Sequence, residues 1–198
     1  MTERPLPLVI VVNGLPATGK TTLARRLADD FHLPLLAKDA IKETLFETLG
    51  WSDRAWSRRL GTATMALLYL LLEEHLRAGQ PCIVECNFYL DRDGERFRAL
   101  QQAYPFMPFQ ILCVADGPTL YARYCQRARS ADRHPGHVET HNLDEHRELL
   151  LRGRIDPLPL GGALYELDTT DFAAMDYRSL YVALNAAAGA RSLTDTRD

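Results

Sequence analysis

The residues with the clearest chemical signature lie in the stretch NGLPATGKTT, which spans residues 13–22. Two glycines, a lysine and a threonine stand there at the spacing G-x-x-x-x-G-K-[ST], the pattern of a loop whose backbone N–H groups surround nucleotide phosphates. In such a loop the lysine reaches the β- and γ-phosphates, and the threonine hydroxyl binds Mg²⁺. We therefore expect ATP and Mg²⁺ to be held by the loop residues Gly14, Leu15, Pro16, Ala17, Thr18, Gly19, Lys20, Thr21 and Thr22.

The residues on both sides of this loop agree with that expectation. Residues 8–12 form an apolar run of the buried-strand type. After the loop, Leu23, Ala24, Leu27 and Ala28 recur at the spacing of one helical face. The N-terminus of this helix would point at the anion, where its backbone N–H groups stabilise negative charge. A glycine-rich turn without a ligand is the alternative, and the motif and its context together argue against it.

Acidic residues follow several of the expected strands. Ligands of open α/β sheets bind outside the carboxyl ends of the strands, where Asp39, Glu85, Asp116 and Asp168 are expected. Asp39 is the candidate for orienting a phosphoryl-acceptor hydroxyl and taking its proton, although it could also cap the helix that follows. Glu85 is the candidate for holding Mg²⁺ together with Thr21, and an ion pair facing a helix is its alternative.

Arginines are concentrated in the segment LYARYCQRARSADRHPGH. Arg123 and Arg127 are four residues apart and share one helical face, and Arg133 lies in a Gly/Pro loop over residues 130–137. Charge that develops between donor and acceptor needs cations that close over it and exclude water. We expect Arg127 and Arg133 to be catalytic, Arg123 to bind the nucleotide, and residues from about 123 to about 140 to form a mobile lid. A solvated basic face is the alternative.

Three histidines lie in or beside the same loop. His137 and His141 are four residues apart, a spacing that can chelate zinc on a helix. The segment lacks a cysteine ligand, and a Pro-Gly pair interrupts the helix. We therefore expect His134, His137 and His141 to make loop or substrate contacts.

The elements that must position these residues alternate along the chain. Strand-like runs lie near 8–13, before 39, and at 81–88, 108–116 and 164–170, and the helix-like segments between them include 20–31, 40–49, 54–78, 118–129 and 142–153. Such alternation predicts an α/β fold, a three-layer P-loop NTPase with a five-stranded parallel sheet covered by helices on both faces. We expect one domain over residues 1–198, with the second strand beside the first.

The overall composition restricts the function classes. The chain has 198 residues and a net charge of −3, which argues against nonspecific binding to a nucleic-acid backbone. Its four cysteines form no C-x-x-C pair. We expect them to be buried free thiols, which suit the reducing cytoplasm. The longest apolar helical segment is interrupted by Glu73 and Glu74, so we expect no membrane span. We expect a cytoplasmic monomer or homodimer.

Four segments of the chain together resemble a known group. GLPATGKTTLARRLA, LAKDAIKETLF, IVECNF and RARSADRHPGH look like the AAA-type, zeta-toxin and chloramphenicol-phosphotransferase-like P-loop kinases, which have the nucleotide-kinase-like fold. The resemblance implies that Asp39 activates the acceptor, that Lys20 and Thr21 serve phosphate and Mg²⁺, and that Arg127 and Arg133 are the lid arginines. The HPGH sequence in the lid is not part of the group's general pattern.

These observations predict an ATP-dependent phosphotransferase that moves the γ-phosphate to a hydroxyl of a small molecule. The alternatives are a toxin-like kinase of a nucleotide sugar, a polynucleotide 5′-hydroxyl kinase, and a non-catalytic nucleotide-binding regulatory ATPase. A kinase needs an acceptor pocket, which a pure switch does not. The residues that could wall such a pocket beside the acceptor carboxylate, unless they belong to the core, are Trp51, Trp56, Arg58, Arg59 and Tyr69.

Overall fold

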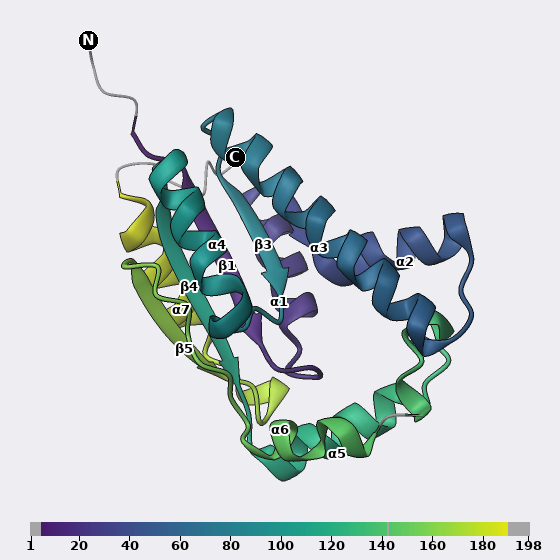
Figure 1. Ribbon diagram of the computed structural model, residues 1–198. Coiled ribbons are helices and arrows are strands. Elements are labelled where there is room, and N and C mark those ends of the chain that lie inside the picture. Colours follow the sequence, from purple (N-terminus) through teal and green to yellow (C-terminus); the bar gives the residue numbers. More distant parts are fainter. Residues whose placement is uncertain (1–4, 142, 190–198) are drawn as a thin grey trace.

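A five-stranded parallel sheet forms the centre of the molecule (Figure 1). The computed structural model describes residues 5–141 and 143–189. The strands are β1 Leu8–Gly14, β2 Leu35–Ala37, β3 Cys82–Cys86, β4 Met107–Val114 and β5 Ala163–Asp168, and their order in the sheet is β2-β3-β1-β4-β5. The predicted parallel sheet is confirmed. The prediction that the second strand lies beside the first is wrong, because β3 lies between them.

Helices follow most of the strands. They are α1 Lys20–Phe31, α2 Lys38–Leu49, α3 Arg54–Arg77, α4 Leu90–Ala103, α5 Gly117–Ala128, α6 Arg147–Leu151 and α7 Tyr177–Ala188. Short 3₁₀ helices are η1 Pro135–His137, η2 Glu139–His141, η3 Asp144–His146 and η4 Phe172–Ala174. The continuous helix predicted over 142–153 is wrong in its described part, which divides into η3 and α6, and residue 142 lies outside the described residues.

Apolar side chains on both faces of the sheet explain its burial. Along β1, Val9 and Val11 pack against α3 and α4, whereas Leu8, Ile10 and Val12 pack against α1 and α7. Every residue of β1 is buried, which is the expected pattern for a central parallel strand covered on both sides. These two packed layers give the three-layer α/β architecture.

The strand order reverses at β1, so the carboxyl end of this strand is the switch point of the sheet. The chain leaves β1 for β2 and β3 on one side of it and reaches β4 and β5 on the other. Two groups of helices stand above this edge: α2 with the start of α3, and α5 with α6 (Figure 1). The segment between α5 and α6 joins the two groups, so the loop after β1 lies between them.

Within the described residues, no helix is both long enough and apolar enough to cross a membrane.

Candidate active site

The predicted phosphate loop connects β1 to α1 in a preformed turn. Both the backbone N–H and the hydroxyl of Thr18 donate to the carbonyl of Leu15, over 3.4 and 2.9 Å. Gly19 has φ +81° and Ala17 has φ +67°, in the left-handed region. For a residue with a Cβ this region costs about 1–2 kcal/mol, so contacts around the loop must hold Ala17 in place. Leu15 is fully buried, so only its backbone faces the loop interior.

Asn13 ties this loop to the end of β3. Its side-chain oxygen accepts from the N–H groups of Gly14 and Phe88, both over 2.8 Å, and its amide donates to the Phe88 carbonyl over 3.0 Å. Sequence reasoning missed this role. A polar residue that directly ends an apolar strand before a phosphate loop was the available signal.

Three predicted site residues lie together at the start of α1. The Lys20 ammonium donates to the Leu15 carbonyl over 3.3 Å and lies 3.8 Å from the carboxylate of Glu85. The Thr21 hydroxyl donates to the other oxygen of Glu85 over 3.2 Å. Burial lowers the pKa of Lys20, against the opposing charges of Glu85 and Asp39. Burial also raises the pKa of Glu85, although the charge of Lys20 opposes that rise.

The donors in this cluster fit Mg²⁺. A hydroxyl and a carboxylate supply oxygen, the ligand that Mg²⁺ prefers, and the ion usually keeps several waters and binds substrate phosphates. Among the residues that the structure describes, no group of three or more His, Cys, Asp or Glu could hold a metal ion. Most ligands of an Mg²⁺ at Thr21 and Glu85 would therefore be phosphate and water oxygens.

Asp39 lies in the first turn of α2 and does not cap it. The N-cap residue is Ala37, which has no side-chain cap, so the capping alternative for Asp39 is wrong. The carboxylate of Asp39 accepts from the Lys38 ammonium over 3.0 Å and from the Arg133 guanidinium over 2.9 Å. Burial would raise the pKa of Asp39, but the charges of Lys38 and Arg133 outweigh it and hold this pKa well below its usual range. The carboxylate is therefore ionised at neutral pH.

Two of the three predicted arginines share a partner, whereas Arg123 has partners of its own. Arg123 donates to the carbonyls of Thr169 and Thr170, each over 2.6 Å, and stacks on the ring of Phe172 at 3.9 Å. Arg127 donates to Glu139 over 3.0 Å, and Arg133 donates to the same carboxylate over 2.6 Å. Sequence reasoning gave Glu139 and Phe172 no role, because neither belongs to a recognisable motif.

One cavity of about 580 Å³ brings most of these side chains together. Asp39 lines it, although the strand before Asp39 is two positions away from β1. Glu85 does not line it and stands behind Thr21. The other lining residues are Ala17, Gly19, Lys20, Thr21, Thr22, Arg25, Ala40, Glu43, Arg123, Gln126, Arg127, Ser130, Asp132, Arg133 and Phe172.

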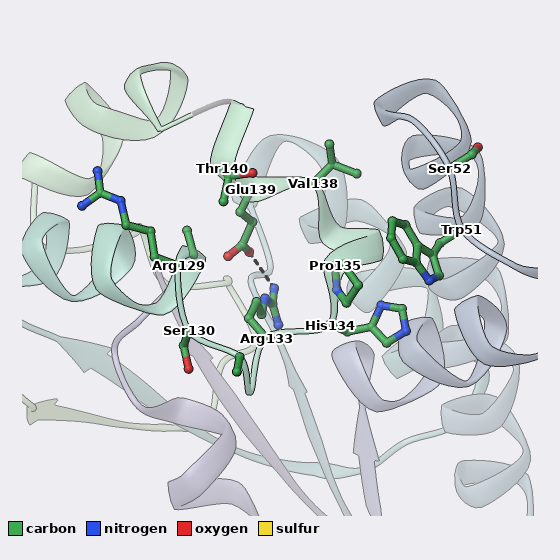
Figure 2. Close-up of a pocket in the computed structure, with 12 residues that line it drawn as sticks. Trp51, Ser52, Arg129, Ser130, Arg133, His134, Pro135, Val138, Glu139 and Thr140 are labelled. Carbon is green, nitrogen blue, oxygen red and sulfur yellow. Dashed lines mark hydrogen bonds and ion pairs between the residues drawn. The ribbon is translucent and has the colours of Figure 1, made fainter.

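A second cavity of about 500 Å³ lies on the other side of the lid (Figure 2). Its walls are the α2–α3 connection, the end of α5 and the lid chain beyond it, and it shares Ser130 and Arg133 with the first cavity. Figure 2 shows Arg133 and Glu139 directed toward each other beside this cavity, whereas the Arg129 side chain points away from them. Arg133 thus borders both cavities.

The lid is docked on α2 by a ladder of polar pairs. Three carboxylates at four-residue spacing accept from three lid side chains: Asp39 from Arg133, Glu43 from His137 over 2.8 Å, and Glu47 from His134 over 2.9 Å. Burial, together with the charge of Arg133, lowers the pKa of His137 to about 2, against the opposing charge of Asp39. His137 is therefore a neutral hydrogen-bond donor at physiological pH.

Phe46 of α2 packs against the two histidines that pair with Glu43 and Glu47. The His134 ring stacks on it at 4.9 Å, and the His137 ring meets it edge-on at 5.3 Å. A Cβ on Gly136 would come within 2.8 Å of the Phe46 ring, so this position favours glycine. The HPGH sequence thus serves as the docking segment of the lid. The structure does not describe the side chain of His141.

Several predicted residues lie elsewhere. Asp116 caps α5 by accepting from the Thr119 N–H, and Asp168 accepts from the Thr170 N–H; neither lines the cavity. Tyr69 is buried in the core and donates to Asp93 over 2.7 Å. Of the expected wall residues, only Trp51 lines a described cavity, the second one. The prediction of an aromatic wall beside Asp39 is therefore wrong, because α3 turns these side chains toward the core, toward solvent or onto neighbouring loops.

Comparison with known proteins adds to this geometry. The family model described as AAA domain matches residues 9–150. The structure of an inferred kinase from Chloroflexus aurantiacus J-10-fl is 42% identical, with a TM-score of 0.82 over 93% of this chain and 99% of that one. No curated protein matches the sequence.

Two more distant solved structures share the fold. A sugar kinase from Janibacter sp. HTCC2649 is 18% identical with a TM-score of 0.53, over 93% of this chain and 98% of that one. A gluconokinase from Sinorhizobium meliloti 1021 is 16% identical with a TM-score of 0.52, over 93% of this chain and 96% of that one. At this level of identity the similarity extends to the fold alone.

Proposed function

This chain belongs to the AAA domain family of P-loop proteins with the nucleotide-kinase-like fold, and from that premise we propose that it is a kinase. The reaction that we propose is transfer of the γ-phosphate of ATP to a hydroxyl group of a small molecule. The other kinases with this fold, one of them 42% identical, support the assignment to this enzyme class.

One observation carries the proposal: Asp39 lines the same cavity as Lys20 and Thr21 of the phosphate loop. A protein that only holds a nucleotide has no need for an ionised carboxylate that faces the phosphate loop from the start of another helix. A kinase needs one, because the acceptor hydroxyl must be oriented and must lose its proton. Asp39 fits this role by its place and by its ionised state.

The proposed step is an in-line displacement at the γ-phosphorus. The acceptor oxygen forms a bond to phosphorus while the bond to the β–γ bridging oxygen breaks, and ADP leaves with that oxygen. The hydroxyl proton passes to the carboxylate of Asp39. Lys20, Arg127 and Arg133 would stabilise the charge on the phosphoryl oxygens.

Other residues would hold the nucleotide and its ion. Thr21 and Glu85 would hold Mg²⁺, which when bound neutralises phosphate charge. The Arg123 guanidinium lies over the Phe172 ring beside Gly19, and these two side chains would contact the nucleotide base. Arg123 would therefore bind the nucleotide and would not contact the reacting atoms.

The proposed acceptor is a small hydroxylated molecule in the cytoplasm. The cavity of about 580 Å³ must also hold the nucleotide phosphates, which limits the space beside Asp39. The net charge of −3 disfavours a polynucleotide acceptor. The proposed kinase is a monomer or a homodimer.

The test is a screen for acceptor-dependent ADP release. Purified protein with ATP and Mg²⁺ is offered sugars, sugar acids, nucleosides, nucleotide sugars and hydroxylated antibiotics, and ADP is measured above the rate without acceptor. We expect one class to stimulate release and the Lys20→Ala variant to show none. ADP release that no acceptor stimulates, with a phosphorylated product absent, would favour a regulatory ATPase instead.

A further inference from the structure

The backbone of the lid contains an unusual turn at Val138. Its φ is +54°, a left-handed conformation that a β-branched residue rarely adopts. The Val138 N–H donates to the Pro135 carbonyl over 3.0 Å, which closes η1 on the docking segment. The next residue, Glu139, begins η2. The turn therefore reverses the chain so that the Glu139 side chain faces back toward α5.

The carboxylate of Glu139 accepts hydrogen bonds from both lid arginines, Arg127 and Arg133. Its Oε1 accepts from Arg127 over 3.0 Å and from Arg133 over 2.6 Å, and the carboxylate is 13% exposed. Figure 2 shows the Glu139 and Arg133 side chains pointing toward each other, Glu139 from the start of η2 and Arg133 from the loop before η1. Because both guanidinium groups lie within hydrogen-bond distance of one carboxylate oxygen, they would repel each other without the anion between them.

The two arginines also have unused hydrogen-bonding capacity. Among the described residues, the buried side-chain nitrogen and oxygen atoms without a hydrogen-bond partner are the Nε atoms of Arg127 and Arg133. A buried donor without a partner is costly, and phosphate oxygens are the acceptors that a guanidinium fork fits best. Both arginines line the cavity of the phosphate loop.

We propose that Glu139 is a positioning residue that holds Arg127 and Arg133 together as a two-arginine clamp for the γ-phosphate. This inference rests on the proposed function. Glu139 does not touch the reacting atoms; it offsets the repulsion between the arginines and fixes the direction of both forks. The left-handed turn at Val138 is the backbone feature that brings its carboxylate to them.

The test compares the affinities for ATP and ADP, because only ATP carries the phosphate that the clamp would bind. Calorimetry with ATP·Mg²⁺ and ADP·Mg²⁺ as probes needs no acceptor. Wild type is expected to bind ATP more tightly than ADP. In Glu139→Gln the ratio of the ADP to the ATP dissociation constant should fall about tenfold, while the affinity for ADP is retained. Glu139→Asp, which keeps the charge, should recover part of the preference.

Glu145→Gln is the matched control. Glu145 is a nearby glutamate that pairs with Arg54 and contacts neither clamp arginine, so its variant should keep the wild-type preference for ATP. Equal weakening of ATP and ADP by Glu139→Gln would overturn the proposal, as would a preference identical to that of wild type. If Glu139→Gln does not fold, Glu139→Ala decides, and an unreduced preference for ATP in that variant would overturn the proposal.

Failure of this inference and failure of the proposed function give different results. If Lys20→Ala binds both nucleotides as wild type does, the nucleotide site itself is wrongly assigned. If Lys20→Ala loses both nucleotides but Glu139→Gln keeps the preference for ATP, the site stands and only the positioning role of Glu139 is wrong.

Discussion

Arg133 donates a hydrogen bond of 2.9 Å to the carboxylate of Asp39, which joins the lid to the first turn of α2. This pairing lowers the basicity of the carboxylate that we propose for the acceptor. A γ-phosphate would compete for the same guanidinium, because it offers more negative charge and a matching fork geometry. If Arg133 binds that phosphate, nucleotide binding and the release of Asp39 are coupled through this one side chain.

The first prediction concerns the response of the lid to nucleotide. If Arg127 and Arg133 contact the γ-phosphate, ATP·Mg²⁺ should slow hydrogen exchange in residues 123–133 as well as in the phosphate loop. The docking segment should change less, since His134 and His137 are already paired with α2. Slower exchange in the phosphate loop alone would contradict a closing lid.

The second prediction concerns the pH dependence of stability. His137 has a folded-state pKa of about 2, whereas an unfolded histidine titrates near 6.5. Below about pH 6.5 the unfolded chain therefore binds a proton that the folded chain does not, and the free energy of unfolding falls as the pH falls. Between about pH 7.5 and about pH 5.5 wild type should lose roughly 1 kcal/mol more than His137→Gln.

Urea unfolding at the two pH values measures this difference. His75→Gln is the control for removing an imidazole, because His75 is only half-buried on α3 and its ring pairs with the Leu71 carbonyl of the same helix and not with a lid residue. An equal loss of stability in wild type and His137→Gln would show that His137 is not held neutral by its burial.

The third prediction concerns Gly19, which has φ +81°. Its Cα lies so close to Phe172 that an added Cβ would come within 2.7 Å of the ring. Gly19→Ala should therefore disturb both the loop backbone and the Phe172–Arg123 stack, and ATP affinity should fall by at least about tenfold. Gly161→Ala, at φ +69° with open space around its Cβ, carries backbone strain of the same kind and should bind ATP normally. Normal affinity in Gly19→Ala, measured by calorimetry, would contradict the assignment of this stack to the nucleotide site.

The parts of the molecule that depend on local pattern could be predicted from the sequence. The buried run of β1, the loop after it and the amphipathic α1 are encoded within a short stretch. The place of β3 between β1 and β2 could not be predicted, because strand order depends on pairing between distant segments. The N-cap of α2 was missed by two positions, since Asp39 looks like a cap but its side chain is directed to Lys38 and Arg133.

The lid contacts were beyond sequence reasoning for a similar reason. Arg133 and Asp39 are 94 residues apart, and no pattern in either segment predicts that the two side chains meet. The spacing of Asp39, Glu43 and Glu47 is typical of any acidic helical face, so the matching lid side chains became visible only in the fold. Glu139 belongs to no recognisable motif, and its two arginine partners follow from the turn at Val138.

The central claim is that Asp39 serves the acceptor and not the nucleotide, and Asp39→Asn tests it most directly once an acceptor is found. Asparagine keeps an acceptor for the Arg133 hydrogen bond, so stability should fall by only about 1–3 kcal/mol. It cannot take the proton, so turnover should fall by about 10²–10⁴-fold. Glu47→Gln makes the same carboxylate-to-amide change at a lid contact on the same helix outside the cavity, and it should keep normal turnover.

The decisive measurement is the turnover number of Asp39→Asn beside its ATP dissociation constant, both taken at a temperature where the variant is folded. We predict a large loss of turnover with no loss of ATP affinity. Turnover close to that of wild type, or a loss of ATP affinity that accounts for the lower rate, would contradict the role of Asp39 and with it the proposed mechanism.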